Sequence, residues 1–67
     1  KRGGTIMAVF TPRQREIARL LARGLSQKEI AHQLGIAQCT VYDHTQAMRR
    51  RSGMTTESIR IKVAISS

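Results

Sequence analysis

The part of the sequence that most constrains the fold is residues 26–51, where two helical patterns flank a single glycine. Ser26 is followed three residues later by Glu29, a capping box that satisfies two backbone amides at the start of a helix. Apolar side chains then recur at helical spacing, at Ile30, Ala31 and Leu34. Gly35 follows where a helix commonly ends in a left-handed residue. These signals predict a short helix over residues 26–34 that stops at Gly35.

A second helix is predicted after the glycine turn, over residues 38–52. Its inward face is formed at positions i, i+4 and i+7 by Val41, Thr45 and Met48. Its opposite face is polar and carries Tyr42, Asp43, Gln46, Arg49 and Arg50. Two helices joined by a short turn that contains glycine form a helix-turn-helix. A polar helix that protrudes from a basic domain suits readout of the DNA major groove.

The segment ahead of this pair predicts a first helix over residues 10–24. Thr11 is a favourable N-cap, Pro12 suits the first helical position, and Gln14 completes another capping box. The inward stripe that follows is formed by Ile17, Leu20 and Leu21. Arginines recur on the opposite face at Arg15, Arg19 and Arg23. We interpret that face as solvated, and the alternative is a docking face for phosphates or for another domain.

The sequence after Gly53 fits either a helix or a strand. Thr55 or Thr56 can cap a helix over residues 56–65, whereas alternating isoleucine and valine between 59 and 65 also fit a strand. A lone strand has no partner here, so a helix is favoured. Residues 1–9 show little pattern and are expected to be a flexible arm or linker. The predicted fold is therefore all-α, with four helices in one domain over residues 10–67.

The charge of the chain indicates a polyanionic partner. Twelve lysines and arginines against four acidic residues give a net charge of +8, which favours nucleic acid. No apolar run approaches the roughly 20 residues of a membrane-spanning helix. One cysteine without an export signal fits the cytoplasm. Because the chain begins at Lys1 and not at methionine, we expect it to be a piece of a longer protein.

The sequence lacks the residue sets of an enzyme or a metal site. It contains no nucleophile–base–acid set, no paired carboxylates and no phosphate-binding glycine loop. His32 and His44 stand apart without a partner cysteine, so zinc is not expected. Cys39 falls in the first turn of the 38–52 helix, where a redox switch is one interpretation and an ordinary small residue is the favoured one. Neither catalysis nor a cofactor is predicted.

Taken together, these residues resemble the four-helix DNA-binding domain of the LuxR/NarL family of bacterial transcription regulators, also called the GerE type. The resemblance covers about residues 10–64. The matching positions include Thr11, Pro12, Glu16, Leu20, Gly24, Lys28, Glu29, Ala31, Gly35, Ile36, Thr40, Val41, His44 and Met48. The family pattern usually has apolar residues at four positions that are polar here: Thr45, Arg49, Ser52 and Arg60. These departures predict a weaker core around the end of the 38–52 helix.

The resemblance also implies roles for individual residues. The positions that face base edges in relatives are held here by Tyr42, Asp43 and Gln46. The positions near the phosphate backbone are held by Lys28, Thr40, His44 and Arg50. Glutamine can pair with adenine, and a carboxylate can accept a hydrogen bond from the amino group of cytosine. Of the three arginines over residues 49–51, one or two are expected to touch phosphate. The plain alternative for all of them is a solvated polar surface.

The predicted function is sequence-specific binding of double-stranded DNA in bacterial transcription regulation, at the nucleoid in the cytoplasm. Two copies would bind half-sites about 10 base pairs apart. The resemblance implies a homodimer contact through the helix over residues 56–65, and RNA polymerase is a further candidate partner. One alternative is region 4 of a sigma factor, which usually ends soon after its recognition helix. The other is a degenerate helix-turn-helix that binds a protein or an acidic membrane surface.

Overall fold

The computed structural model describes residues 6–66, which form four α-helices and one short 3-10 helix. The elements follow one another as η1 (Ile6–Val9), α1 (Pro12–Ala22), α2 (Gln27–Leu34), α3 (Gln38–Ser52) and α4 (Thr56–Ser66). This confirms the all-α prediction with four helices. The segment that fitted either a helix or a strand is helical. Within the described part of the chain, no helix is long and apolar enough to cross a membrane.

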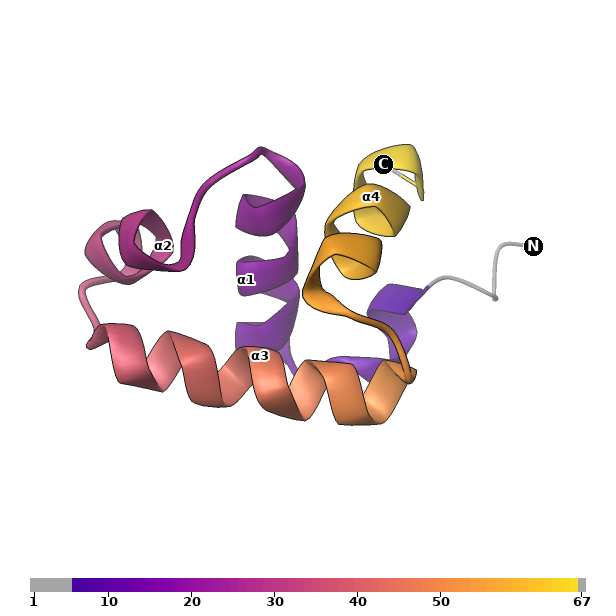
Figure 1. Cartoon of the computed structure of the whole chain (residues 1–67), viewed down its shortest axis with the longest axis horizontal. Helices are drawn as coiled ribbons and strands as arrows, with labels where there is room; N and C mark the ends of the chain where they lie inside the picture. Colours follow the sequence, from indigo (N-terminus) through magenta and orange to yellow (C-terminus); the bar gives the residue numbers. More distant parts are fainter. Residues whose placement is uncertain (1–5, 67) are drawn as a thin grey trace.

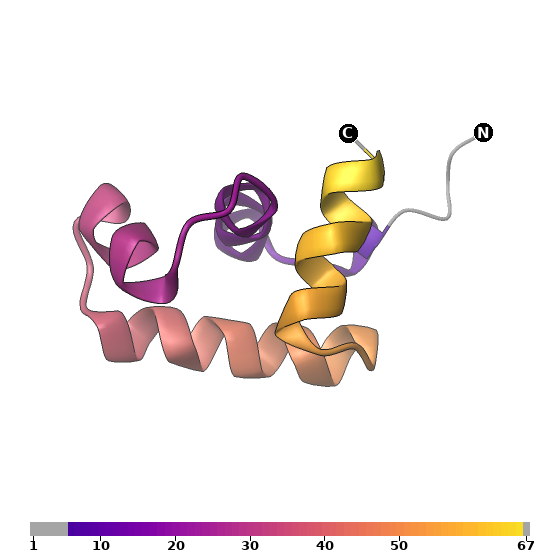
Figure 2. The ribbon, with the colours of Figure 1, turned by 45° about the horizontal axis from the view of Figure 1, so that its top comes forward.

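The longest helix, α3, forms the base on which the other helices stand (Figure 1). α1 and α4 lie side by side above it and share the most extensive contact in the domain. α2 packs mainly on the N-terminal part of α3, and Figure 2 shows the same arrangement from a second direction. One long side of α3 is consequently left uncovered by the rest of the domain.

The first two helices begin with the capping boxes that the sequence predicts. The backbone N–H of Gln14 donates to Thr11 Oγ1 (3.2 Å), and the Thr11 N–H donates back to Gln14 Oε1 (3.0 Å). Ser26 and Glu29 repeat the arrangement at the start of α2, with distances of 3.2 and 2.8 Å. Each box satisfies amides that a helix start leaves without intrahelical partners. These contacts fix where α1 and α2 begin.

Glycines end the two helices of the helix-turn-helix. Gly35 closes α2 with a φ of 68°, and Gly53 closes α3 with a φ of 71°. Other residues pay a steric penalty in this left-handed conformation, because their Cβ approaches the carbonyl oxygen. The short turn between α2 and α3 therefore depends on glycine at position 35.

The core is a single apolar cluster to which every element contributes. Its fully buried centre comes from α1, α2, α3 and α4 and includes Ile17, Leu21, Ile30, Val41, Met48 and Ile59. Ile6 and Phe10 add the N-terminal side. All four helices thus stabilise one another through the same cluster, as expected where short isolated helices are marginal in water.

The N-terminal segment differs from the expected flexible arm over residues 1–9. Residues 6–9 form η1, which packs against both α3 and α4. Ile6 is buried and belongs to the core cluster, so apolar burial outweighs the lack of a helical pattern. Residues 1–5 lie outside the described part of the chain. The packed unit therefore begins before Phe10.

Three of the four polar side chains at the departures from the family pattern donate to backbone carbonyl groups, and the fourth, Arg49, is exposed. Thr45 is 1% exposed, and its hydroxyl donates to the Tyr42 carbonyl at 2.8 Å. The Ser52 hydroxyl donates to the Met48 carbonyl at 2.8 Å. Arg60 donates to the carbonyls of Leu21 (2.8 Å) and Leu25 (3.3 Å), and so ties α4 to the end of α1. At these three positions a hydrogen bond takes the place of apolar packing, within α3 for Thr45 and Ser52 and between segments far apart in the chain for Arg60.

Replacing the buried Thr45 with valine is expected to raise the free energy of unfolding by about 1 kcal/mol. Valine keeps the branched shape, and the Tyr42 carbonyl stays within the hydrogen-bonded body of α3. Hydroxyl bonds to a preceding carbonyl also bend helices slightly. Urea unfolding followed by circular dichroism measures the change, with Thr40→Val on the same helix as a half-exposed control. A loss of stability at position 45 would show that the hydroxyl is needed.

Candidate nucleic-acid interface

The uncovered side of α3 carries a stripe of side chains at helical spacing. Val41, Thr45 and Met48 point into the core. The positions opposite them on a helix with 3.6 residues per turn are Cys39, Asp43, Gln46 and Arg50. We call these four residues the outer stripe. Because it lies away from α1, α2 and α4, a ligand approaching α3 from solvent meets this stripe first.

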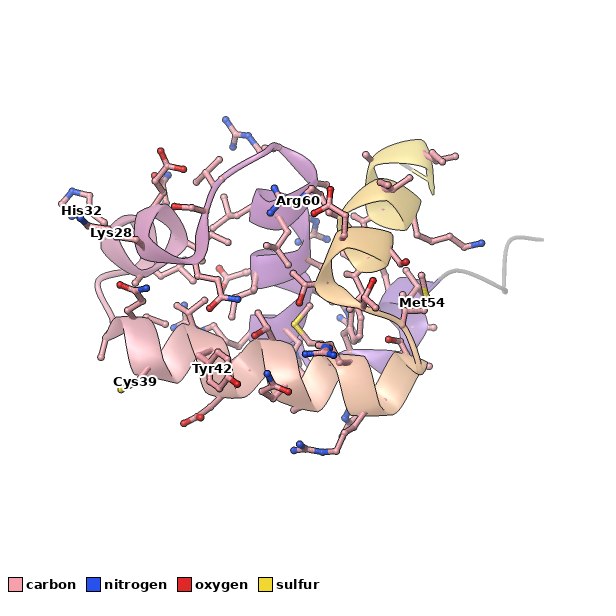
Figure 3. The ribbon with its side chains drawn as sticks, in the orientation of Figure 1. Lys28, His32, Cys39, Tyr42, Met54 and Arg60 are labelled. Carbon is pink, nitrogen blue, oxygen red and sulfur yellow. The ribbon has the colours of Figure 1, made fainter. Side chains whose placement is uncertain are left out.

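The three residues predicted to contact bases lie on or beside the outer stripe. Asp43 and Gln46 belong to it, and Tyr42 lies on one flank with 52% of its surface exposed. Figure 3 shows Cys39 on the first turn of α3 and Tyr42 about one turn further along. None of these side chains has a hydrogen-bond or ion-pair partner within residues 6–66. Their donors and acceptors are therefore free for an external ligand.

The residues predicted to contact phosphate come from two helices and are not gathered at one place. Thr40 and His44 share the flank of α3 opposite to Tyr42, and both are half-buried. Arg50 is exposed and lies in line with Asp43 and Gln46, not on a flank. Lys28 is exposed on α2, where it points away from α3 together with His32 (Figure 3). The structure thus groups Thr40 with His44 and leaves Lys28 at a separate position.

The uncovered side of α3 is positively charged except at Asp43. The side chains of Arg49 and Arg50 make no ion pair or hydrogen bond within residues 6–66. Three of the four carboxylates lie elsewhere: Glu16 pairs with Arg13 at 3.3 Å, Glu57 pairs with Arg60 at 3.6 Å, and Glu29 caps α2. Asp43 is the only acidic residue of α3. The positive charge of this side favours a polyanionic ligand. The negatively charged Asp43 would be stabilised next to such a ligand only by a hydrogen-bond donor of that ligand.

The start of α3 adds backbone donors to the same surface. The N-cap residue is Ala37, whose side chain cannot accept a hydrogen bond, and no side chain caps this helix. The amides of a helix start that lack such a cap are available to anions. The starts of α1 and α2 differ, because their capping boxes occupy two amides each.

Two arginines have structural contacts that the sequence did not reveal. Arg51 Nη1 donates to the Val9 carbonyl of η1 at 2.8 Å. Arg15 Nε donates to the Met7 carbonyl at 3.2 Å. Both arginines donate to backbone carbonyls of η1. The sequence analysis expected this segment to be a flexible arm, so it predicted no contact between η1 and the helices. Arg51 is thereby distinguished from its neighbours Arg49 and Arg50, whose guanidinium groups are free.

The histidine, cysteine and acidic side chains of the described residues are spread over all four helices. No group of three or more histidine, cysteine or acidic side chains that could hold a metal ion occurs among residues 6–66. Cys39 is an exposed free cysteine. His32 and His44 lie on different helices. The residues brought together on the uncovered side of α3 are mostly polar.

Comparisons with known proteins place the chain beside bacterial regulatory proteins. The model of a family described as bacterial regulatory proteins, luxR family (GerE), matches residues 8–64. The transcriptional regulatory protein MctR of Rhizobium johnstonii is 40% identical over 56 residues, which is 84% of this chain and 26% of that protein. The chain therefore spans about a quarter of the length of this relative. No solved structure gave a significant match.

Proposed function

Because the chain belongs to the luxR family of bacterial regulatory proteins, whose helix-turn-helix domains bind DNA to regulate transcription, we propose that α3 is its recognition helix. In this proposal α3 enters the major groove and reads a specific sequence. The observation that carries it is the outer stripe with Tyr42 beside it, where polar side chains stand opposite the core without partners. A groove about 12 Å wide admits one α-helix.

The three base-contacting candidates have different chemistry. The Gln46 amide can donate to and accept from the adenine edge at once. The Asp43 carboxylate accepts only, so it suits the amino group of cytosine and is repelled by phosphate. The Tyr42 ring can cover a thymine methyl, and its hydroxyl can reach a phosphate. Of the phosphate candidates, Thr40 and His44 lie on the flank away from Tyr42, while Lys28 and Arg50 add charge.

Replacing Gln46 with alanine is expected to remove base preference at one position of the site. The loss of a bidentate contact costs about 1–3 kcal/mol of discrimination, roughly 5- to 150-fold. The measurement begins with selection of bound duplexes from a random pool, followed by binding of the selected duplex and its single-base variants. Arg50→Ala should instead weaken all duplexes alike.

The matched control for this variant is Gln33→Ala, which removes an exposed glutamine from α2. It should leave both affinity and base preference unchanged. If the wild-type domain shows no preference for any duplex over random DNA at low salt, α3 is not a sequence reader. The alternative of a protein-interaction module would then account for the surface.

The luxR family match displaces the sigma-factor alternative. The helix after Gly53 agrees with this, since a region 4 module usually ends soon after its recognition helix. We further propose that α4 is the contact between two copies on DNA. Its outward positions Ile61 and Ile65 are 52% and 77% exposed, and exposed apolar side chains on a small helical domain suit a second copy.

A further inference from the structure

A hollow at the C-terminal end of α3 extends the outer stripe beyond Gln46. It is lined by Gln46, Arg49, Arg50, Gly53, Met54 and Thr55, from the last turns of α3 and the connection to α4. Figure 3 shows Met54 on this connection, past the last turn of α3. We call the hollow lined by these six residues the α3-end hollow. Its wall holds two arginines and no carboxylate, so it suits an anion.

The proposed phosphate contacts on the two flanks of α3 differ. Thr40 and His44 share one flank, and Arg49 lies on the other with Tyr42. A helix in the major groove is bounded by a phosphate backbone on each side, one from each strand. Residues on opposite flanks therefore face phosphates of opposite strands. The proposed function places no phosphate-binding cation on the flank of Arg49, which would face the strand not contacted by Thr40 and His44.

The length of α3 brings its last turn to the groove wall. Its 15 residues span about 22 Å at 1.5 Å per residue, against a groove about 12 Å wide. If the middle of the helix meets base edges through Asp43 and Gln46, its end extends past the bases. Arg49 and Arg50 lie one helical turn beyond Gln46. At that distance along the helix axis, α3 has left the base edges and reaches the phosphate backbone at the side of the groove.

Arg49 is free to make this contact, in contrast to Arg51. The Arg51 guanidinium is held by the Val9 carbonyl, whereas the Arg49 guanidinium is exposed and has no partner within residues 6–66. The position usually carries an apolar residue in the resembling family, so the contact would be a property of this chain. A guanidinium is also well matched to phosphate, because its donors form a planar fork.

We infer that the α3-end hollow binds a backbone phosphate of the DNA, with Arg49 contacting the strand opposite to that contacted by Thr40 and His44. This inference rests on the proposed function and extends it to a residue and a strand. Arg50 closes the other side of the hollow. The contact sets affinity and orientation on the duplex and carries no base preference.

The first test is the salt dependence of binding to the selected duplex and to random DNA. Removing one phosphate contact lowers the slope of log K against log salt by about 0.9 per bound copy. Arg49→Ala should show this change with both duplexes and weaken both by a similar factor, up to about tenfold. Arg19→Ala removes an arginine of α1 whose side chain is likewise exposed and without a partner, and it should leave the slope unchanged. Arg49→Gln, which keeps most of the side chain, should behave like Arg49→Ala.

The second test assigns the strand. Single phosphates of a duplex that carries one half-site, and so binds a single copy, are replaced by neutral methylphosphonates, one position and one strand at a time. One replacement should weaken the wild-type domain but have no further effect on Arg49→Ala. The corresponding replacement for His44→Ala should fall on the other strand. Thermal unfolding by circular dichroism confirms that each variant is folded before binding is compared.

Two results would overturn the inference. One is a salt slope of Arg49→Ala equal to that of Arg19→Ala, which would leave the hollow to another partner such as an acidic peptide. The other is that the phosphate whose replacement has no further effect on Arg49→Ala and the corresponding phosphate for His44→Ala lie on the same strand. Both differ from failure of the proposed function, which would appear in the wild-type domain as no preference for any duplex.

Discussion

Replacing Leu21 with alanine is expected to lower the free energy of unfolding by about 2–5 kcal/mol and to leave much of the domain unfolded. Leu21 is fully buried on α1 at the centre of the core cluster. The total stability of a chain of this size is only about 3–10 kcal/mol, and a domain this small buries a limited share of its surface. Because all four helices share one cluster, a cavity here removes support from each of them.

Urea unfolding followed by circular dichroism measures the loss directly. The matched control is Arg19→Ala on the same helix, where the side chain is exposed and the same truncation should change stability by less than about 0.5 kcal/mol. DNA binding of Leu21→Ala should fall with the folded fraction. An unfolding midpoint equal to that of Arg19→Ala would contradict the shared core described for this fold.

Replacing both Ile61 and Ile65 with serine is expected to weaken binding to a duplex with two half-sites by about 100-fold or more. If two copies touch through α4, the first bound copy raises the effective concentration of the second. The substituted side chains are 52% and 77% exposed, so the fold of a single copy should be unchanged. Affinity is measured by electrophoretic mobility shift over a range of protein concentrations.

A duplex with one half-site serves as the internal control for this double variant. Binding to that duplex involves a single copy, so wild type and variant should bind it equally well. Half-sites moved apart by five base pairs should remove the advantage of the wild type, because the two copies then face different sides of the duplex. Equal binding of both proteins to the two-site duplex would show that α4 is not the contact.

The local signals in the sequence predicted the helix-turn-helix because its boundaries depend on neighbouring residues. The Ser26–Glu29 box and Gly35 are interactions within a few residues, and both occur in the structure as predicted. The predicted range of the recognition helix, 38–52, equals that of α3. The first helix begins as predicted, with Thr11 as its N-cap and Pro12 as its first residue, but it ends at Ala22 with Arg23 at its C-cap, slightly before the predicted end at Gly24.

Two of the contacts that sequence reasoning missed join segments far apart in the chain. Arg51 meets Val9 across 42 positions, and Arg60 meets Leu21 across 39. Neither pair has a spacing that a helical pattern could reveal. The buried position of Ile6 likewise depends on the packing of η1 against α3 and α4. The roles of Tyr42, Asp43 and Gln46 stay predictions, because they depend on a ligand.

The bond between Arg51 and the Val9 carbonyl has a mechanical consequence. η1 is fastened at Met7 by Arg15 and at Val9 by Arg51, and the second fastening lies on the last turn of α3. Force applied to the backbone ahead of Ile6 is therefore transmitted to that turn, a few residues from Arg49 and Gln46. A displacement of η1 would therefore reach the last turn of α3 directly through Arg51.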